Sequence, residues 1–329
     1  MSAFLDSIVS RAKAQRKTIV LPEGDDPRTL EAAERVLADG VADLIILGDA
    51  EAIAASGRKL DGARIIDPAA YEERESLAQV LFEVRKNKGM TIEEAREKLD
   101  DVLYFGVMLV KTGAADGMVA GACHATGDVL RPSLQILKTA PGAALVSSFF
   151  IMCVPDCDLG AQGTFLFSDC GLEVQPSAER LANIAVSSAA SFKALVGEEP
   201  QVALLSHSSH GSAKNDDALK VVEATRIAKE LAPNVAIDGE LQLDAAIIPE
   251  IGASKAPGSP VAGHANVLVF PDLDAGNIGY KLVQRLAKAE AYGPVTQGIA
   301  APVNDLSRGC CADDIYGVIA ITSVQAAVE

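Results

Sequence analysis

The chain has 329 residues, of which 49% are apolar and 4% aromatic, and its formal net charge is −16. This length and composition predict two α/β domains whose cores are filled by aliphatic side chains. The acidic charge excludes a broad nucleic-acid surface, because such a surface needs clustered Lys and Arg. No apolar run reaches about 18 residues and the N-terminus is not signal-like, so we expect no membrane segment and a cytoplasmic protein.

Six cysteines lie at positions 123, 153, 157, 170, 310 and 311, and none of them forms a CxxC pair. We therefore expect reduced thiols and neither a disulfide framework nor a structural zinc site. His207 and His210 lack an obvious acidic or thiol third ligand, so loop histidines are a better interpretation than a metal site. No Walker or GxGxxG pattern is present, which gives little support to a bound nucleotide cofactor.

Short apolar runs alternate with amphipathic helical patterns along the chain, and this order is typical of parallel sheets. The first series has predicted strands at 17–21, 43–47, 65–66 and 117–120, and helices at 30–37, 71–88 and 128–138. Between these, Thr91 and Glu94 predict a capping box. The second series has predicted strands at 144–151, 164–167, 202–205, 235–237 and 267–270, and helices at 176–196, 217–231 and 275–289. A last helix is predicted at 313–326.

Two segments are the weakest joints by composition, Pro141-Gly142 and residues 293–302. If both are hinges, the last helix belongs to one of the two domains, and composition does not decide which. A cleft between the domains is the expected ligand site.

The densest group of reactive residues stands just before the last predicted helix, in the segment 304–315. A helix N-terminus has free N–H groups and a positive dipole end, which suit a phosphate, and Arg308 adds a fork of donors. The alternative is that Ser307 and Asp313 only cap the helix while Arg308 is solvated. The local pattern favours neither interpretation.

A second group, residues 124–132, follows the predicted strand at 117–120 and so lies at the carboxyl end of a parallel strand. Ligand sites of α/β proteins gather at such ends. Arg131 could face that site, but the spacing also allows a surface pair with Asp128 at i,i+3, which the local pattern favours.

Several longer motifs resemble those of the phosphate acetyltransferases (phosphotransacetylases) of the phosphate acetyl/butyryltransferase family, in the short form without an N-terminal regulatory region. The resemblance covers the chain from about residue 15 onward. The matching segments are Val20-Leu-Pro-Glu-Gly24, Asp116-Gly-Met-Val-Ala-Gly121, Leu130-Arg-Pro-Ser-Leu-Gln135, Ser147-Ser-Phe-Phe-Ile-Met152, Asp238-Gly-Glu-Leu-Gln242, Val267-Leu-Val-Phe-Pro271, Asn277-Ile-Gly279 and Pro302-Val-Asn-Asp-Leu-Ser-Arg-Gly309.

The resemblance implies a fold similar to isocitrate and isopropylmalate dehydrogenases, with two α/β lobes flanking a cleft. It implies a first domain of residues 1–142 plus 298–329, a second domain of residues 143–297, and a homodimer. It also implies that Ser307, Arg308 and Asp314 form the reactive site, with Arg85 and Arg131 assisting in substrate binding. The implied substrates are coenzyme A or acetyl-CoA, acetyl phosphate and phosphate, with no metal and no tightly bound cofactor.

The implied reaction moves an acetyl group reversibly between acetyl phosphate and coenzyme A. Our hypothesis is direct attack by the thiol in a ternary complex, with Asp314 as general base, Arg308 and Arg131 holding phosphate, and Ser307 donating a hydrogen bond. A covalent acyl-enzyme on Cys310 or Ser307 is the competing mechanism.

Two other functions are weighed as alternatives. A phosphate butyryltransferase shares the fold and the chemistry, and the departures from the family pattern at His207-Ser-Ser-His210, Gly127 and Tyr316 bear on acyl size and not on the reaction. A metal- and NAD-dependent hydroxy-acid dehydrogenase shares the implied fold, but the sequence offers no convincing metal-binding aspartates or cofactor loop.

Overall fold

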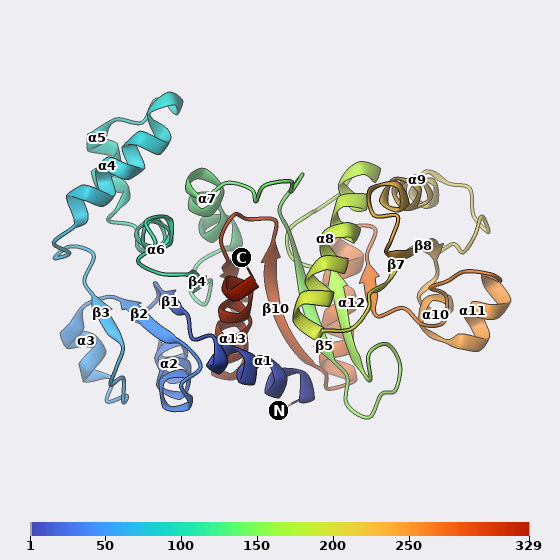
Figure 1. Ribbon diagram of the computed structural model, residues 1–329, viewed down its shortest axis with the longest axis horizontal. Helices are drawn as coiled ribbons and strands as arrows, with labels where there is room; N and C mark the ends of the chain where they lie inside the picture. The colour runs from blue at the N-terminus through green and yellow to red at the C-terminus, as the bar shows by residue number, and fades with distance from the viewer. Residues whose placement is uncertain (1, 329) are drawn as a thin grey trace. The chain divides into compact units, whose positions relative to one another are not determined.

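The computed structural model describes residues 2–328, and its contacts divide the chain into two compact units. Unit 1 contains Ala3–Pro141 together with the chain from Ile299 to its last described residue, and unit 2 contains Gly142–Gly298. The chain therefore leaves unit 1 and returns to it. In Figure 1 the red helix α13 (Ala312–Val328) accordingly lies beside the blue helix α1 (Ala3–Ala14).

Unit 1 is built on a five-stranded sheet in the order β11-β4-β1-β2-β3, in which every neighbouring pair is parallel. Its strands are β1 (Thr18–Leu21), β2 (Asp43–Leu47), β3 (Arg64–Ile66), β4 (Gly117–Ala120) and β11 (Val303–Asp305). The central strands are continuously apolar, and Ile19, Val20 and Leu21 are completely buried. Burying such side chains contributes about 1.5–3 kcal/mol each, which explains why these short runs form strands.

Helices connect the strands of unit 1, and capping side chains set where several of them begin. The helices after α1 are α2 (Pro27–Asp39), α3 (Ala50–Ala55), α4 (Arg74–Arg85), the 3-10 turn η1 (Lys86–Lys88), α5 (Ile92–Lys98), α6 (Val102–Lys111), α7 (Thr126–Ile136) and α13. The Asp26 side chain accepts N–H groups at the start of α2, and Asp101 does so for α6. The predicted capping box of Thr91 and Glu94 is confirmed at α5.

The strand order reverses direction between β1 and β4, because the chain first adds β2 and β3 on one side of β1 and later β4 and β11 on the other. In an open parallel sheet, the crevice at the carboxyl ends of the strands beside such a switch point is the usual ligand site. The loops that follow β1, β4 and β11 all emerge at this edge, because the three strands are parallel.

Unit 2 has a mixed six-stranded sheet in the order β10-β5-β6-β9-β7-β8. Its strands are β5 (Ser147–Cys153), β6 (Thr164–Ser168), β7 (Gln201–Leu205), β8 (Ala236–Leu241), β9 (Val267–Val269) and β10 (Glu290–Gln297). Strands β10, β5 and β6 pair antiparallel and the others pair parallel. The expectation of a weak joint over residues 293–302 is wrong for its first half, because β10 runs to Gln297.

The helices of unit 2 are α8 (Ala178–Val196), α9 (Asp216–Leu231), α10 (Leu243–Ile247), α11 (Pro249–Lys255) and α12 (Leu273–Leu286). Its core includes Phe150, whose ring stacks on Tyr280 at a centroid distance of 4.0 Å. None of the helices in the described part of the chain is long and apolar enough to cross a membrane.

Candidate active site

The side chain of Glu23, directly after β1, is surrounded by donors from the loop that follows β4. Its carboxylate accepts backbone N–H groups from Gly121, Ala122, Cys123 and His124 at 2.9–3.2 Å. The side chain of His124 adds another contact, because its Nδ1 atom lies 2.7 Å from Oε1 of Glu23. Successive N–H groups of this kind form a concave anion site. Here the protein's own carboxylate fills it, so these N–H groups are not available to a bound anion.

Arg28, in the first turn of α2, ties together the loops after β4 and β11. Its Nη1 donates to the carbonyl oxygens of Arg308 (2.9 Å) and Cys310 (3.1 Å), and its Nη2 donates to that of Ala122 (2.8 Å). The guanidinium also forms a two-point ion pair with Asp26. This pair lowers the pKa of Asp26 and raises that of Arg28. Arg28 is therefore engaged in holding the backbone that precedes α13.

Ser307 and Arg308 lie in the loop between β11 and α13, and both are exposed. The carbonyl of Ser307 accepts the N–H of Cys310 at 2.9 Å, and its hydroxyl oxygen accepts the N–H of Gly309 at 3.3 Å. The helix begins at Ala312, five residues after Ser307, so the alternative in which Ser307 caps the helix is wrong. The Ser307 side chain is placed where its hydroxyl hydrogen can serve a ligand.

Asp313 and Asp314 stand in the first turn of α13, and the structure gives them different partners. The Oδ2 atom of Asp314 accepts the N–H of Cys311 at 2.9 Å, as the acidic residue of a capping box does. Asp313 forms an ion pair with Arg35 of α2 and does not cap the helix. Asp314 is partly buried, so its carboxylate is held beside the Ser307–Cys311 loop while keeping access to solvent.

Asp305, the last residue of β11, is the most deeply buried acid at this edge, with 1% of its surface exposed. Its Oδ2 atom accepts the hydroxyl of Thr126, the first residue of α7, at 2.5 Å. Burial raises the pKa of Asp305 to about 7.

Arg85 and Arg131 come from different helices, α4 and α7, and line one open cavity of about 580 Å³. The full lining is Arg85, Lys88, Gly89, Met90, Glu94, Glu97, Lys98, Tyr104, Arg131 and Gln135. The expected surface pair is also present, because Arg131 lies 3.4 Å from Asp128 with both side chains at least half exposed. No carboxylate among the described residues lies within 4 Å of the Arg85 guanidinium. The cavity is lined by four cationic side chains and two carboxylates, and Arg85 is one of its cations without an ion-pair partner among the described residues.

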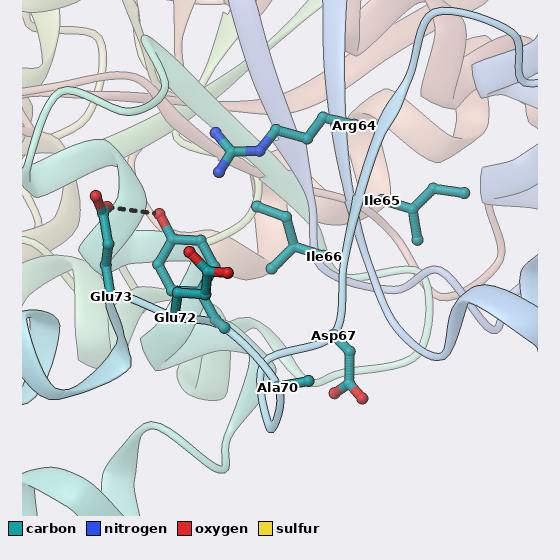
Figure 2. Close-up of a pocket in the computed structure, with 8 residues that line it drawn as sticks. Arg64, Ile65, Ile66, Asp67, Ala70, Glu72 and Glu73 are labelled. Atoms are coloured by element: carbon teal, nitrogen blue, oxygen red, sulfur yellow. Dashed lines mark hydrogen bonds between the residues drawn. The ribbon is translucent and has the colours of Figure 1, made fainter.

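Two other cavities of unit 1 contain none of the predicted site residues. One, of about 290 Å³, lies along the edge strand β3, and Arg64 and Glu73 are among its lining residues (Figure 2). The Tyr71 hydroxyl there donates to Glu73 at 3.0 Å, and the Arg64 guanidinium lies over the Tyr71 ring. The other, of about 430 Å³, lies between the starts of α2 and α3 and is lined in part by Leu30 and Ile53.

The cysteine and histidine candidates have structural partners. Burial raises the pKa of Cys310 to about 11, which is unfavourable for a thiolate nucleophile. His210 contacts Asp238 at 3.3 Å and His207 contacts Asn215 at 3.3 Å. Within residues 2–328, no group of three or more His, Cys, Asp or Glu side chains is arranged to hold a metal ion.

The molecule consists of two α/β units, and its candidate reactive side chains follow the carboxyl ends of parallel strands. It therefore belongs to the class of two-lobed α/β proteins. A solved structure of a putative 4-hydroxythreonine-4-phosphate dehydrogenase from Salmonella typhimurium shares this fold, with a TM-score of 0.54 at 12% identity over 94% of this chain and 99% of that one. The predicted two-lobed fold is thereby confirmed.

The family model "Phosphate acetyl/butaryl transferase" matches residues 3–323, and the chain belongs to this family. A phosphate acetyltransferase of Acetivibrio thermocellus is 60% identical over 98% of both chains. A solved phosphotransacetylase of Streptococcus pyogenes superposes with a TM-score of 0.93 at 45% identity, covering both chains completely. The predicted family and the predicted enzyme class, an acyltransferase, are confirmed.

Sequence reasoning missed three residues that organise this site: Glu23, Arg28 and Asp305. Glu23 stood inside a matching motif, directly after a predicted strand, and this position was the available signal. Asp305 stood within the reactive segment 304–315 but carried no expected role. The sequence near Arg28 shows only its local partner Asp26, because the carbonyl oxygens that give Arg28 its role lie about 94 and 280 positions away.

Proposed function

We propose that this protein transfers an acetyl group reversibly between acetyl phosphate and coenzyme A, at the start of α13, with coenzyme A as a substrate and no tightly bound cofactor. The observation that carries the proposal is the joining of Ser307, Arg308 and Asp314 at one helix N-terminus, on a loop held by Arg28. The names of the relatives reported above support the same reaction.

We assign the chemistry to three side chains. Arg308 and the N-terminal end of α13 hold the phosphate, because a guanidinium fork and a helix dipole both favour phosphate oxygens. The Ser307 hydroxyl donates to the developing oxyanion or to phosphate. Asp314 accepts the thiol proton of coenzyme A. An ordinary carboxylate and thiol differ in pKa by roughly 4–5 units, so proton transfer is concerted with attack on the carbonyl.

The direct test of the reaction is thioester formation from acetyl phosphate and coenzyme A, followed in the ultraviolet. Absence of turnover by the folded protein would overturn the proposal. Replacing Asp314 by Asn should lower kcat by about 10²–10⁴-fold with little change in stability, as expected for loss of a general base. Near-normal turnover of this variant would refute the assignment of Asp314.

Direct transfer is favoured over a covalent acyl-enzyme. Cys310 is 7% exposed and its pKa is raised by burial, and neither it nor Ser307 has a His–Asp pair in its loop to activate it. Exchange of labelled phosphate into acetyl phosphate in the absence of coenzyme A would contradict this mechanism.

The cavity of Arg85 and Arg131 is proposed to bind the phosphate groups of coenzyme A. Arg131 lies five residues after Thr126, about 7.5 Å along the axis of α7. Thr126 in turn touches Asp305 at the end of β11, so the cavity lies close to the Ser307 loop. In this assignment Arg131 binds coenzyme A together with Arg85, and it does not hold the phosphate of acetyl phosphate together with Arg308.

Replacing Arg85 or Arg131 by Gln should raise KM for coenzyme A by about 10-fold each, the effect of losing one charge-assisted contact. KM for acetyl phosphate should change less than KM for coenzyme A. Arg64→Gln, in the cavity at β3, is the matched control that should alter neither constant. Equal changes in both constants would contradict the assignment.

Acyl preference is the point at which the butyryltransferase alternative differs. We propose acetyl transfer because the relatives reported above are acetyl-transferring enzymes by name. Comparing kcat/KM for acetyl, propionyl and butyryl phosphates decides between the two, and a preference for butyryl phosphate would favour the alternative.

We also propose that the protein is a homodimer and is cytoplasmic, as its six free cysteines suggest. Ile278, Leu282 and Leu286 form an exposed apolar stripe on α12, at 58%, 52% and 79% exposure. Such a stripe is typical of a surface that another chain covers. Leu282→Glu should shift the protein to monomers in size-exclusion chromatography with light scattering, whereas Val174→Glu, on an exposed loop, should not. A monomeric unmodified protein would refute the proposal.

A further inference from the structure

Asp305 differs from the other buried acids of the chain in how few hydrogen bonds it accepts. Its Oδ1 atom is, among the described side chains, the only buried carboxylate oxygen without a well-aligned hydrogen-bond partner, and the backbone N–H of Leu306 is the one further donor beside this carboxylate. By contrast, the carboxylate of Asp169 in unit 2 accepts the N–H groups of Ser148, Gly171 and Leu172 and the hydroxyl of Ser148. A buried carboxylate with so few donors is costly, which points to a role other than stability.

The space around Oδ1 is closed by the backbone of the neighbouring strand. A Cβ atom added to Gly121 would lie 2.2 Å from Oδ1 and 2.5 Å from the backbone nitrogen of Leu306. Gly121 also has a φ of +109°, a conformation that residues with a side chain rarely adopt. The glycine therefore lets the loop after β4 pass directly over Asp305, and the carboxylate can move little.

The side-chain hydrogen bond from Thr126 to Asp305 joins two segments that the proposed reaction needs. Asp305 precedes Ser307 and Arg308 by two and three residues, and Thr126 precedes Arg131 by five. The contact thus connects the loop that would hold the acyl phosphate to the helix that would hold coenzyme A, across 179 residues of sequence.

We propose that Asp305 is a positioning residue: by accepting the Thr126 hydroxyl, its carboxylate sets the Ser307–Arg308 loop against the start of α7. This inference rests on the proposed function. Glu23, after β1, and Arg308, on its own loop, are the charged groups that act on Asp305. Thr126 of α7 and Gly121 after β4 face it without charge.

The surroundings of Asp305 shift its pKa in opposite directions. Burial raises its pKa most and the negative charge of Glu23 adds to this, while the Thr126 hydroxyl, the backbone N–H of Leu306 and the charge of Arg308 lower it. When Asp305 takes up a proton, the bond to Thr126 loses its ionic character and the attraction for Arg308 disappears. We therefore expect kcat/KM for acetyl phosphate to fall on the acid side of about pH 7, as this carboxyl becomes protonated.

Thr126→Val removes the hydroxyl and keeps the side-chain shape. It should lower kcat/KM for acetyl phosphate by about 10–100-fold, the effect of one hydrogen bond to a charged group. The acid limb of the pH profile should also move to higher pH, because the carboxylate loses its side-chain donor. Thr126→Ser should restore both properties. Thr112→Val is the matched control, because its hydroxyl only bonds carbonyls of its own helix, and it should change neither.

Asp305→Asn gives an independent test, because it removes the titrating carboxyl and should abolish the acid limb that belongs to it. An unchanged rate and pH profile in Thr126→Val, or a Thr126→Ser variant as impaired as Thr126→Val, would overturn the inference. An Asp305→Asn variant that keeps the wild-type acid limb would overturn it even where Thr126→Val fails to fold. An inactive wild-type protein would instead refute the proposed function, so the two failures are distinguishable.

Discussion

Glu23 and Asp305 lie on either side of β4, both almost completely buried, and the number of donors around them differs greatly. Glu23 accepts four backbone N–H groups and also contacts His124, whereas the donors to Asp305 are the Thr126 hydroxyl and the backbone N–H of Leu306. Burial alone therefore does not determine what a carboxylate does. The many donors around Glu23 let its carboxylate shape a loop, whereas burial with few donors raises the pKa of Asp305 to about 7.

The largest effect should follow from removing the charge of Glu23. Glu23→Gln leaves several loop N–H groups without an anionic acceptor, and we expect the free energy of unfolding to fall by about 3–5 kcal/mol. Urea denaturation measures this loss. Glu31→Gln, at an exposed ion pair with Arg58, is the control and should cost less than about 1 kcal/mol. Equal losses of unfolding free energy in the two variants would show that Glu23 contributes no more to stability than Glu31 does.

A smaller effect on the free energy of unfolding is expected at Asp305, where the ionised carboxylate destabilises the folded protein, whereas that of Glu23 stabilises it. Its pKa of about 7 in the folded protein exceeds the unfolded value of about 3.9, so the folded state binds the extra proton between these values. Stability must then decrease as pH rises through this window. Relative to Asp305→Asn, the wild type should lose about 3 kcal/mol of unfolding free energy between pH 5 and pH 8. A constant difference between the two proteins would show that Asp305 has an ordinary pKa.

The smallest effect is expected for His124→Ala. Glu23 keeps its four backbone donors in this variant, and the imidazole is about one-third exposed. The free energy of unfolding at pH 7.5 should therefore fall by no more than about 1 kcal/mol. Thermal or urea denaturation beside wild type measures it. A loss as large as that of Glu23→Gln would mean that the histidine, and not the loop backbone, is the main partner of the carboxylate.

Most strands of the fold could be predicted from sequence because buried parallel strands are short, continuously apolar runs. Strand β10 was missed because Gly293 and Pro294 interrupt it, and both residues usually weaken a strand. The sheet accommodates them because β10 is an edge strand whose pairing with β5 shifts register between Tyr292 and Val295. The predicted domain boundaries, 1–142 plus 298–329 and 143–297, stay a prediction.

The candidate site was only partly predictable, because some of its contacts join residues that are far apart in the sequence. Ser307, Arg308 and Asp314 are close in sequence, so a local pattern joins them. The contacts of Glu23 with the loop after β4 span about 98–101 residues and depend on the strand order, which no local pattern contains. The roles of the predicted residues stay proposals until the variants above are measured.

The return of the chain to unit 1 has a consequence for how the protein is made. The segment from β11 to α13, whose connecting loop and first helical turn carry every residue proposed for the chemical step, belongs to unit 1 but follows Gly142–Gly298 of unit 2 in the chain. Chains emerge at about 5–20 residues per second, and domains generally fold as units during synthesis. Unit 2 can therefore complete its sheet on the ribosome while unit 1 still lacks its edge strand β11. The residues proposed for the chemical step are thus added to unit 1 only after unit 2 has been synthesised.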